Sequence, residues 1–228
     1  MIGVLGYASY LLPIISFLVF SMKKAKWELW VIFFYVLLAF GTDFLLRSPI
    51  GQLHSQEFIE IFTICEFTIF SLYFYSSLKN RKLRRIILFT YSLVLIFLVY
   101  NALKSNKEKF DSINVSTESV TIIVFCVIFF FEEINKPLPY VMYNSPSFWI
   151  ILAILIYMAS TLFLFIIAGN LSEQEKAKYW TINSISNIIS NVIFAIAFIK
   201  AKNNFKNPLK KSQLEYNNIP ENHRKLEP

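Results

Sequence analysis

Two glutamates lie inside a stretch of the chain that is otherwise apolar enough to span a membrane. The stretch reads FIEIFTICEF over residues 58–67, and it places Glu60 and Glu66 among Phe and Ile side chains. A charged carboxylate at the centre of a bilayer costs about 2.5–3.5 kcal/mol on insertion scales, and ionisable residues at such depths usually have a function. Proton transfer and the binding of a charged ligand are the two kinds of chemistry that these carboxylates predict.

Other polar residues in apolar stretches extend this set. Asp43 occurs in GTDFLLR and Glu118 in STES, and either could join Glu66 in acid–base chemistry. Three asparagines follow one another at intervals of four residues, which places them on one face of a helix. The expected ligand site comprises Glu60, Glu66, Thr63, Tyr157, Trp180, Asn183, Asn187 and Asn191.

Several of these positions also have a structural explanation. Asp43 can pair with Arg47 one helical turn further on. Glu118 is expected in the first turn of its helix, where a carboxylate interacts favourably with the helix dipole. The asparagines can link helices by hydrogen bonds. Glu66 has none of these explanations, so it is the strongest functional candidate.

The composition of the chain indicates a membrane protein. Of its 228 residues 56% are hydrophobic and 16% are charged, whereas soluble domains average about 45–50% and about 25%. The apolar residues form seven blocks, each close to the roughly 20 residues that span a bilayer. We predict an all-α bundle of seven transmembrane helices at about 3–22, 28–46, 56–77, 85–103, 116–133, 147–169 and 178–200.

The distribution of basic residues predicts the orientation. Of the 22 Lys and Arg residues, 16 fall in alternate connectors and in the C-terminal segment. The positive-inside rule then places the N-terminus outside and the C-terminus in the cytoplasm. Residues 201–228 are polar and basic, so we expect a flexible cytoplasmic tail. This pattern accounts for the net charge of +7 without nucleic-acid binding.

Several known seven-helix families are excluded by single residues. Microbial rhodopsins need a lysine in the middle of the last helix, whereas Lys200 lies at its end. Ceramidase-like hydrolases need three metal-binding histidines, and the chain has two histidines. GTDFLL resembles a Gly-Asp stretch of the membrane lysoplasmalogenases, but LIYMASTLFLF in the sixth block lacks their second aspartate. We expect no metal and no cofactor.

The chain as a whole resembles small seven-helix integral membrane proteins of bacteria for which no activity is known. The similarity rests on the glutamate-bearing third block that ends in LYFY, on FWI and LIYMASTLFLF in the sixth, and on the asparagine-rich seventh block after YW. It implies a fold and a topology only, and no activity. We expect the protein to lie in the bacterial inner membrane.

Three functions remain open at this point. The first is a receptor-like or sensory bundle that binds a small amphipathic ligand in an outward-facing polar pocket. The second is a membrane-embedded enzyme that uses paired carboxylates on a lipid or isoprenoid, and the third is a proton-coupled transporter. The non-enzymatic interpretation is favoured. Expected partners are membrane lipid, the small ligand and a cytoplasmic protein that binds the basic tail.

Overall fold

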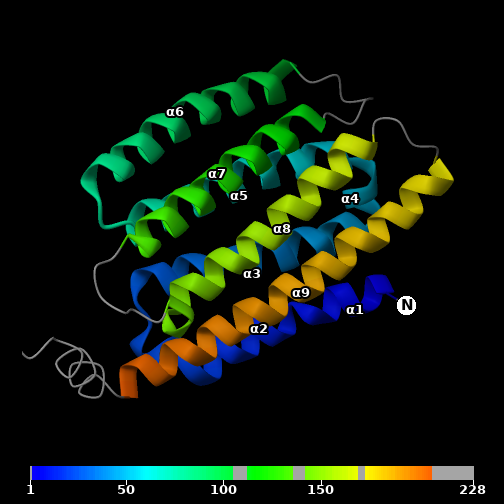
Figure 1. The fold of residues 1–228 in the computed structure, drawn as a ribbon. Coiled ribbons are helices and arrows are strands. Elements are labelled where there is room, and N and C mark those ends of the chain that lie inside the picture. Colours follow the sequence, from blue (N-terminus) through cyan, green and yellow to red (C-terminus); the bar gives the residue numbers. More distant parts are fainter. Residues whose placement is uncertain (1, 105–111, 136–141, 169–172, 207–228) are drawn as a thin grey trace, which may run out of the picture.

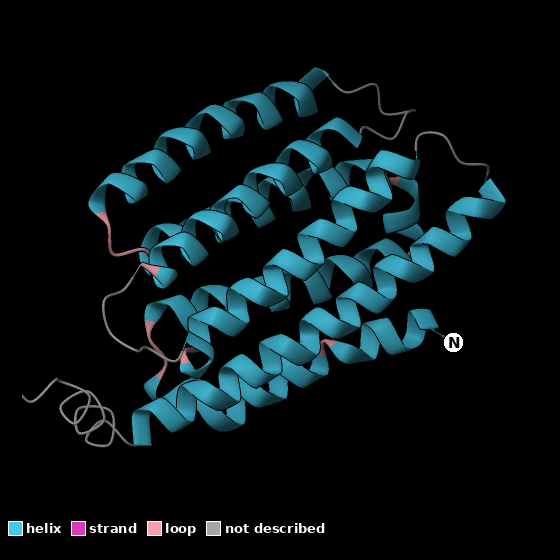
Figure 2. Ribbon diagram, viewed as in Figure 1, coloured by secondary structure: helices cyan, strands magenta, loops and turns pink. Residues whose placement is uncertain are grey.

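The computed structural model describes residues 2–104, 112–135, 142–168 and 173–206. These residues form helices and contain no strand, which confirms the all-α prediction (Figure 2). The α-helices are α1 (Ile2–Ser9), α2 (Leu11–Ser16), α3 (Trp27–Arg47), α4 (Pro49–Leu53), α5 (Ser55–Ser77), α6 (Arg81–Lys104), α7 (Ser112–Ile134), α8 (Pro146–Ala168) and α9 (Glu173–Lys206). A π-helical turn (Phe17–Ser21) and two 3₁₀ turns (Met22–Lys24 and Met142–Asn144) complete the set.

Six of the helices, namely α3, α5, α6, α7, α8 and α9, are long and apolar enough to cross a membrane. This supports a multi-pass membrane protein. The first apolar segment, Leu5–Ser21, is shorter. It is also interrupted at Tyr10, because Pro13 has no N–H to donate to the carbonyl of Ser9 four residues earlier. The proline therefore divides the first segment into α1 and α2, and Tyr10 lies at the break.

The first segment, formed by α1 and α2, and the six long helices run in alternating directions through the bundle (Figure 1). In this view α7, α8 and α9 lie in front of α5 and α3, and α1 and α2 pack along α9. Helix α6 lies at the edge, where it contacts α5 and α7. Only Ile87 and Leu98 of α6 are buried, so most of its apolar surface faces away from the protein.

One end of the bundle collects the basic connectors. The turns after the first segment and after α5, together with the last turns of α9, lie at the same end (Figure 1). At this end the Nζ atom of Lys200 lies 5.2 Å from the ring centroid of Trp149, and Arg84 lies over the ring of Tyr75. We call this the basic end, and the end that carries α4 the opposite end.

The half of the bundle toward the basic end is packed with aromatic side chains. The rings of Phe17 and Phe33 are stacked with their centroids 4.2 Å apart, and those of Tyr35 and Phe70 are 4.4 Å apart. The largest fully buried side chains in the described residues include Phe17, Phe67, Phe70, Tyr73, Phe74, Phe125, Phe194 and Phe198. Such packing leaves little room for water.

Several helices extend beyond the ranges expected from the sequence, and two of these differences change the interpretation of a residue or segment. Helix α7 begins at Ser112, so Glu118 lies in its second turn and not in the first. Its carboxyl is too far from the helix end for the dipole interaction that the sequence suggested. Helix α9 continues to Lys206, so the first residues of the expected tail are helical. The rest of that tail, from 207 to 228, lies outside the described residues.

Candidate functional site

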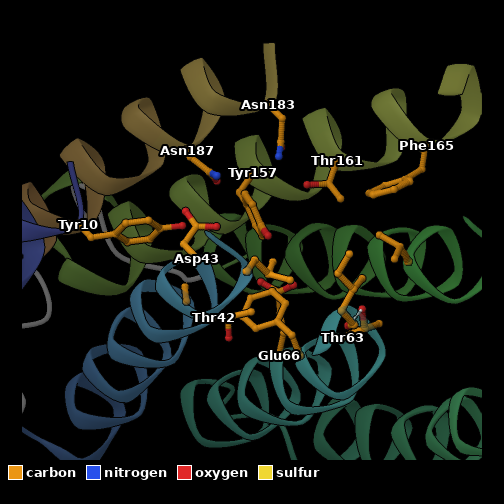
Figure 3. A pocket seen from close by; sticks show the side chains of 15 residues that line it. Tyr10, Thr42, Asp43, Thr63, Glu66, Tyr157, Thr161, Phe165, Asn183 and Asn187 are labelled. Atoms are coloured by element: carbon orange, nitrogen blue, oxygen red, sulfur yellow. Dashed lines mark hydrogen bonds between the residues drawn. The ribbon is translucent and has the colours of Figure 1, made fainter. Parts of the chain in front are cut away.

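A cavity of about 130 Å³ lies between five helices in the half of the bundle toward the opposite end (Figure 3). It is partly enclosed by protein. Its walls come from the break at Tyr10, from the last turns of α3, from the first half of α5, from the start of α7, and from α8 and α9. The lining residues are Tyr10, Ala39, Thr42, Asp43, Leu46, Ile59, Phe62, Thr63, Glu66, Val115, Tyr157, Thr161, Phe165, Asn183 and Asn187.

Glu66 is the most buried acid that lines this cavity. It lies midway along α5 and is 4% exposed. The hydroxyl groups of Tyr35 on α3 and Tyr157 on α8 are within hydrogen-bonding reach of its carboxyl group. One oxygen of this carboxyl group, Oε1, has no hydrogen-bond partner. Glu66 is therefore held by two helices while one of its oxygens remains able to accept a hydrogen bond.

Asp43 forms a second acidic group at the same cavity. The hydroxyl of Tyr10 points toward its carboxyl group and is within hydrogen-bonding reach of it (Figure 3). Arg47, one turn further along α3, interacts electrostatically with Asp43. The Arg47 guanidinium also lies 5.3 Å from the ring centroid of Tyr7. Asp43 thus has the basic neighbour that the sequence suggested, and it also lines the cavity.

The remaining polar wall comes from α5, α8 and α9. Asn183 and Asn187 point toward the cavity from α9 (Figure 3), and Oδ1 of Asn183 has no hydrogen-bond partner. The hydroxyl of Thr161 on α8 is buried and also has no partner. Thr63, by contrast, donates a 2.9 Å hydrogen bond to the carbonyl of Ile59 on its own helix. Amide and hydroxyl groups without partners can orient a polar ligand.

The structure therefore brings together six of the residues selected from the sequence: Asp43, Thr63, Glu66, Tyr157, Asn183 and Asn187. The other four are not among the described lining residues. Glu60 is half-buried outside the lining and accepts a 3.3 Å hydrogen bond from Gln56. Asn191 donates to Ser9 of α1 at 2.8 Å. Trp180 belongs to the first turns of α9, and its side chain is outside the described part of the structure.

Glu118, the fourth of these residues, is buried on α7 behind the cavity wall. It is 1% exposed, and its Oε1 atom has no hydrogen-bond partner. It does not line the cavity, but it is close enough to Glu66 for the two carboxyl groups to interact electrostatically. The pair concentrates negative charge, or shared protons, at this depth of the bundle.

The sequence reasoning did not select Tyr10 and Tyr35. Tyr35, Ala39 and Asp43 are spaced by four residues, so they share one face of α3. This spacing is a signal that Tyr35 faces the same way as Asp43. Tyr10 carries no comparable signal, because its position depends on where Pro13 interrupts the helix.

The described residues contain no group of three or more His, Cys, Asp or Glu side chains that could hold a metal ion. The two cysteines, Cys65 and Cys126, are free thiols. No protein-family model, curated protein or solved structure matches the chain significantly. The geometry of the cavity is therefore the basis on which its function is inferred.

Proposed function

We propose that this protein is a receptor-like seven-helix membrane protein that binds a small amphipathic ligand in the cavity around Glu66. The observation that carries the proposal is the Glu66 side chain, which is buried in the middle of the bundle, lines the cavity and has an oxygen atom without a hydrogen-bond partner. Burying a polar group without a partner costs free energy. Such a group is a common feature of a site that a ligand completes.

The composition of the walls supports an amphipathic ligand. Polar groups of Asp43, Glu66, Asn183 and Asn187 face the cavity together with the apolar side chains of Ile59, Leu46, Phe62, Val115 and Phe165. Ligand sites in proteins are mostly apolar, with a few polar groups that fix the orientation of the ligand. A molecule with one polar head and a short apolar body fits both parts of this lining.

We further propose that the N-terminus is outside, that the basic end faces the cytoplasm of a bacterium, and that the first segment also spans its inner membrane. The positive-inside rule is the reason for this orientation. All lining residues lie between the middle of the bundle and the end opposite to the basic end. With this orientation the ligand enters from outside, and the basic end meets cytoplasmic proteins or anionic lipids.

The experiment is a screen of small amphipathic compounds for those that raise the melting temperature of the purified protein in detergent. At least one compound that binds in the cavity is expected to lose its shift in Glu66→Gln and to keep it in Glu60→Gln. The second variant is a matched control, because it makes the same change on the same helix outside the lining. The proposal fails if Glu66→Gln leaves the shift of every binder unchanged.

A membrane-embedded lipid or isoprenoid enzyme is the second candidate. It is favoured by one observation, namely that Asp43 and Glu66 line the same cavity from different helices. Two carboxyl groups in unlike environments can divide the roles of general acid and general base. Lipid extracts of cells that make the protein would then differ from those of cells that make Asp43→Asn. Identical extracts under several growth conditions would exclude this candidate.

A proton-coupled transporter is less well supported than the ligand-binding protein or the membrane-embedded enzyme. Tyr35, which lies within hydrogen-bonding reach of Glu66, packs against both Phe70 and Phe194. The aromatic core continues from there toward the basic end. A transport pathway would have to cross this layer, so the cavity is better suited to binding from one side.

A further inference from the structure

The ionisable groups among the described residues that line the cavity are all acids or tyrosines. Asp43 and Glu66 line it together with Tyr10 and Tyr157, and no Lys, Arg or His is among these described lining residues. Glu118 adds a third carboxyl group behind the wall. The electrostatic character of the cavity is therefore negative or, where carboxyl groups are protonated, neutral. An anionic ligand would be repelled from it.

The two lining acids differ in what balances their charge. Asp43 has the guanidinium of Arg47 one turn away on the same helix. Glu66 interacts with the hydroxyls of Tyr35 and Tyr157 and, electrostatically, with Tyr10 and with Glu118, which is itself acidic. Hydroxyl donors stabilise a carboxylate only in part, because they bring no positive charge. A cation would therefore form a more favourable electrostatic interaction with Glu66 than with Asp43.

The size of the cavity limits what this cation can be. A cavity of about 150 Å³ in a protein core accommodates benzene, and this cavity measures about 130 Å³. The occupant is therefore a molecule of about five or six non-hydrogen atoms, or the head of a longer molecule that extends through the open side. Part of the cavity wall is aromatic and consists of the rings of Tyr10, Phe62, Tyr157 and Phe165. Aromatic faces attract ammonium groups as well as alkyl groups.

We propose that the cavity selects a small organic ammonium ion, with its N–H groups donating to Glu66 and its alkyl body against Phe62 and Phe165. This inference rests on the proposed function, since it names the chemical class of the ligand for the same cavity. A bare inorganic cation is a poorer fit, because six of the described wall residues are apolar and offer it no ligands. The described residues also contain no group of three or more His, Cys, Asp or Glu side chains that could hold a metal ion.

The test compares three probes of equal length that differ in charge, namely n-butylamine, n-butanol and butyrate. Each is titrated into the purified wild-type protein in detergent, and binding is followed by ligand-observed NMR. We expect n-butylamine to bind about tenfold or more tightly than n-butanol, which corresponds to one modest ion pair. Butyrate is expected to bind most weakly. This comparison needs no variant, so it does not depend on whether a substituted protein folds.

Variants then assign the preference to one residue. Glu66→Gln should lower the affinity for n-butylamine about tenfold and leave that for n-butanol within about twofold, whereas Glu60→Gln should change neither. Equal binding of the amine and the alcohol by the wild type would overturn the ammonium inference and leave the proposed ligand site intact. The absence of binding by all three probes would overturn both. Preference for the amine that survives in Glu66→Gln would overturn the assignment to Glu66.

Discussion

The amide Nδ2 of Asn191 on α9 donates a 2.8 Å hydrogen bond to Oγ of Ser9 on α1, and both side chains are buried. Oγ of Ser9 in turn donates to the carbonyl of Gly6 at 2.6 Å. Asn191 lies one turn from Asn187, which lines the cavity. One row of asparagines therefore serves two purposes, because its first two members face the cavity and its third connects two helices.

This division predicts different effects for two similar substitutions. Asn191→Ala should destabilise the protein by about 0.6–1.7 kcal/mol, which lies between the average and the largest value measured for hydrogen bonds between membrane helices. Its ligand binding should be unchanged. Asn187→Ala should alter ligand affinity with little effect on stability. Unfolding in a denaturing detergent measures the first property, and titration with a cavity ligand measures the second. The reverse pattern would contradict the assignment of the two asparagines.

A second prediction concerns the start of α6 at the basic end. The carboxylate of Glu132 at the end of α7 accepts hydrogen bonds from the backbone N–H groups of Lys79 (3.0 Å) and Asn80 (2.8 Å). Oδ1 of Asn80 accepts from the N–H of Lys82 at 2.9 Å and so caps α6. Glu132 thus fixes the peripheral helix α6 to the bundle at its first turn.

Glu132→Ala should weaken this attachment by about 1–2 kcal/mol, since charged acceptors form the stronger hydrogen bonds. We expect faster amide hydrogen exchange at residues 79–84 and faster proteolysis in the basic KNRKLRR segment. Exchange in α8 serves as the internal control and should not change. Uniformly faster exchange throughout the protein would indicate that Glu132 stabilises the fold as a whole, contrary to this local role.

The proposed orientation can be tested with a thiol reagent that does not cross membranes. Cys65 and Cys126 are first replaced by Ala, and Leu53→Cys or Lys82→Cys is then introduced at exposed positions near opposite ends of the bundle. In intact cells Leu53→Cys should react, whereas Lys82→Cys should react only after the membrane is permeabilised. Labelling of Lys82→Cys in intact cells would place the basic end outside and reverse the orientation.

Much of the fold follows from local properties of the sequence. A helix that crosses a bilayer needs a continuous apolar stretch, because its backbone groups can bond only to one another. The positions of α3, α5 and α8 could therefore be found from hydropathy alone. Spacing within one helix also indicates which side chains share a face. Tyr157, Thr161 and Phe165 are four residues apart on α8, and all three line the cavity.

The sequence does not reveal which helices are neighbours in the bundle. Glu60 and Glu66 are both acids of α5, yet only Glu66 meets Tyr35 and Tyr157, because those two side chains arrive from α3 and α8. The position of Asn191 opposite Ser9 depends in the same way on the packing of α1 against α9. Side-chain packing between segments distant in sequence decides these contacts, and periodicity within a single helix carries no information about it.

The central claim is that the cavity beside Glu66 is a binding site that small molecules can enter and occupy. The most direct measurement is the rate at which 2-aminoethyl methanethiosulfonate modifies Thr161→Cys in the purified, otherwise cysteine-free protein, with and without n-butylamine or n-butanol. We predict that Thr161→Cys reacts, that at least one of the two compounds slows the reaction about tenfold at ten times its Kd, and that Leu53→Cys is unaffected. A Thr161→Cys protein that does not react, or whose reaction neither compound slows, would contradict the claim.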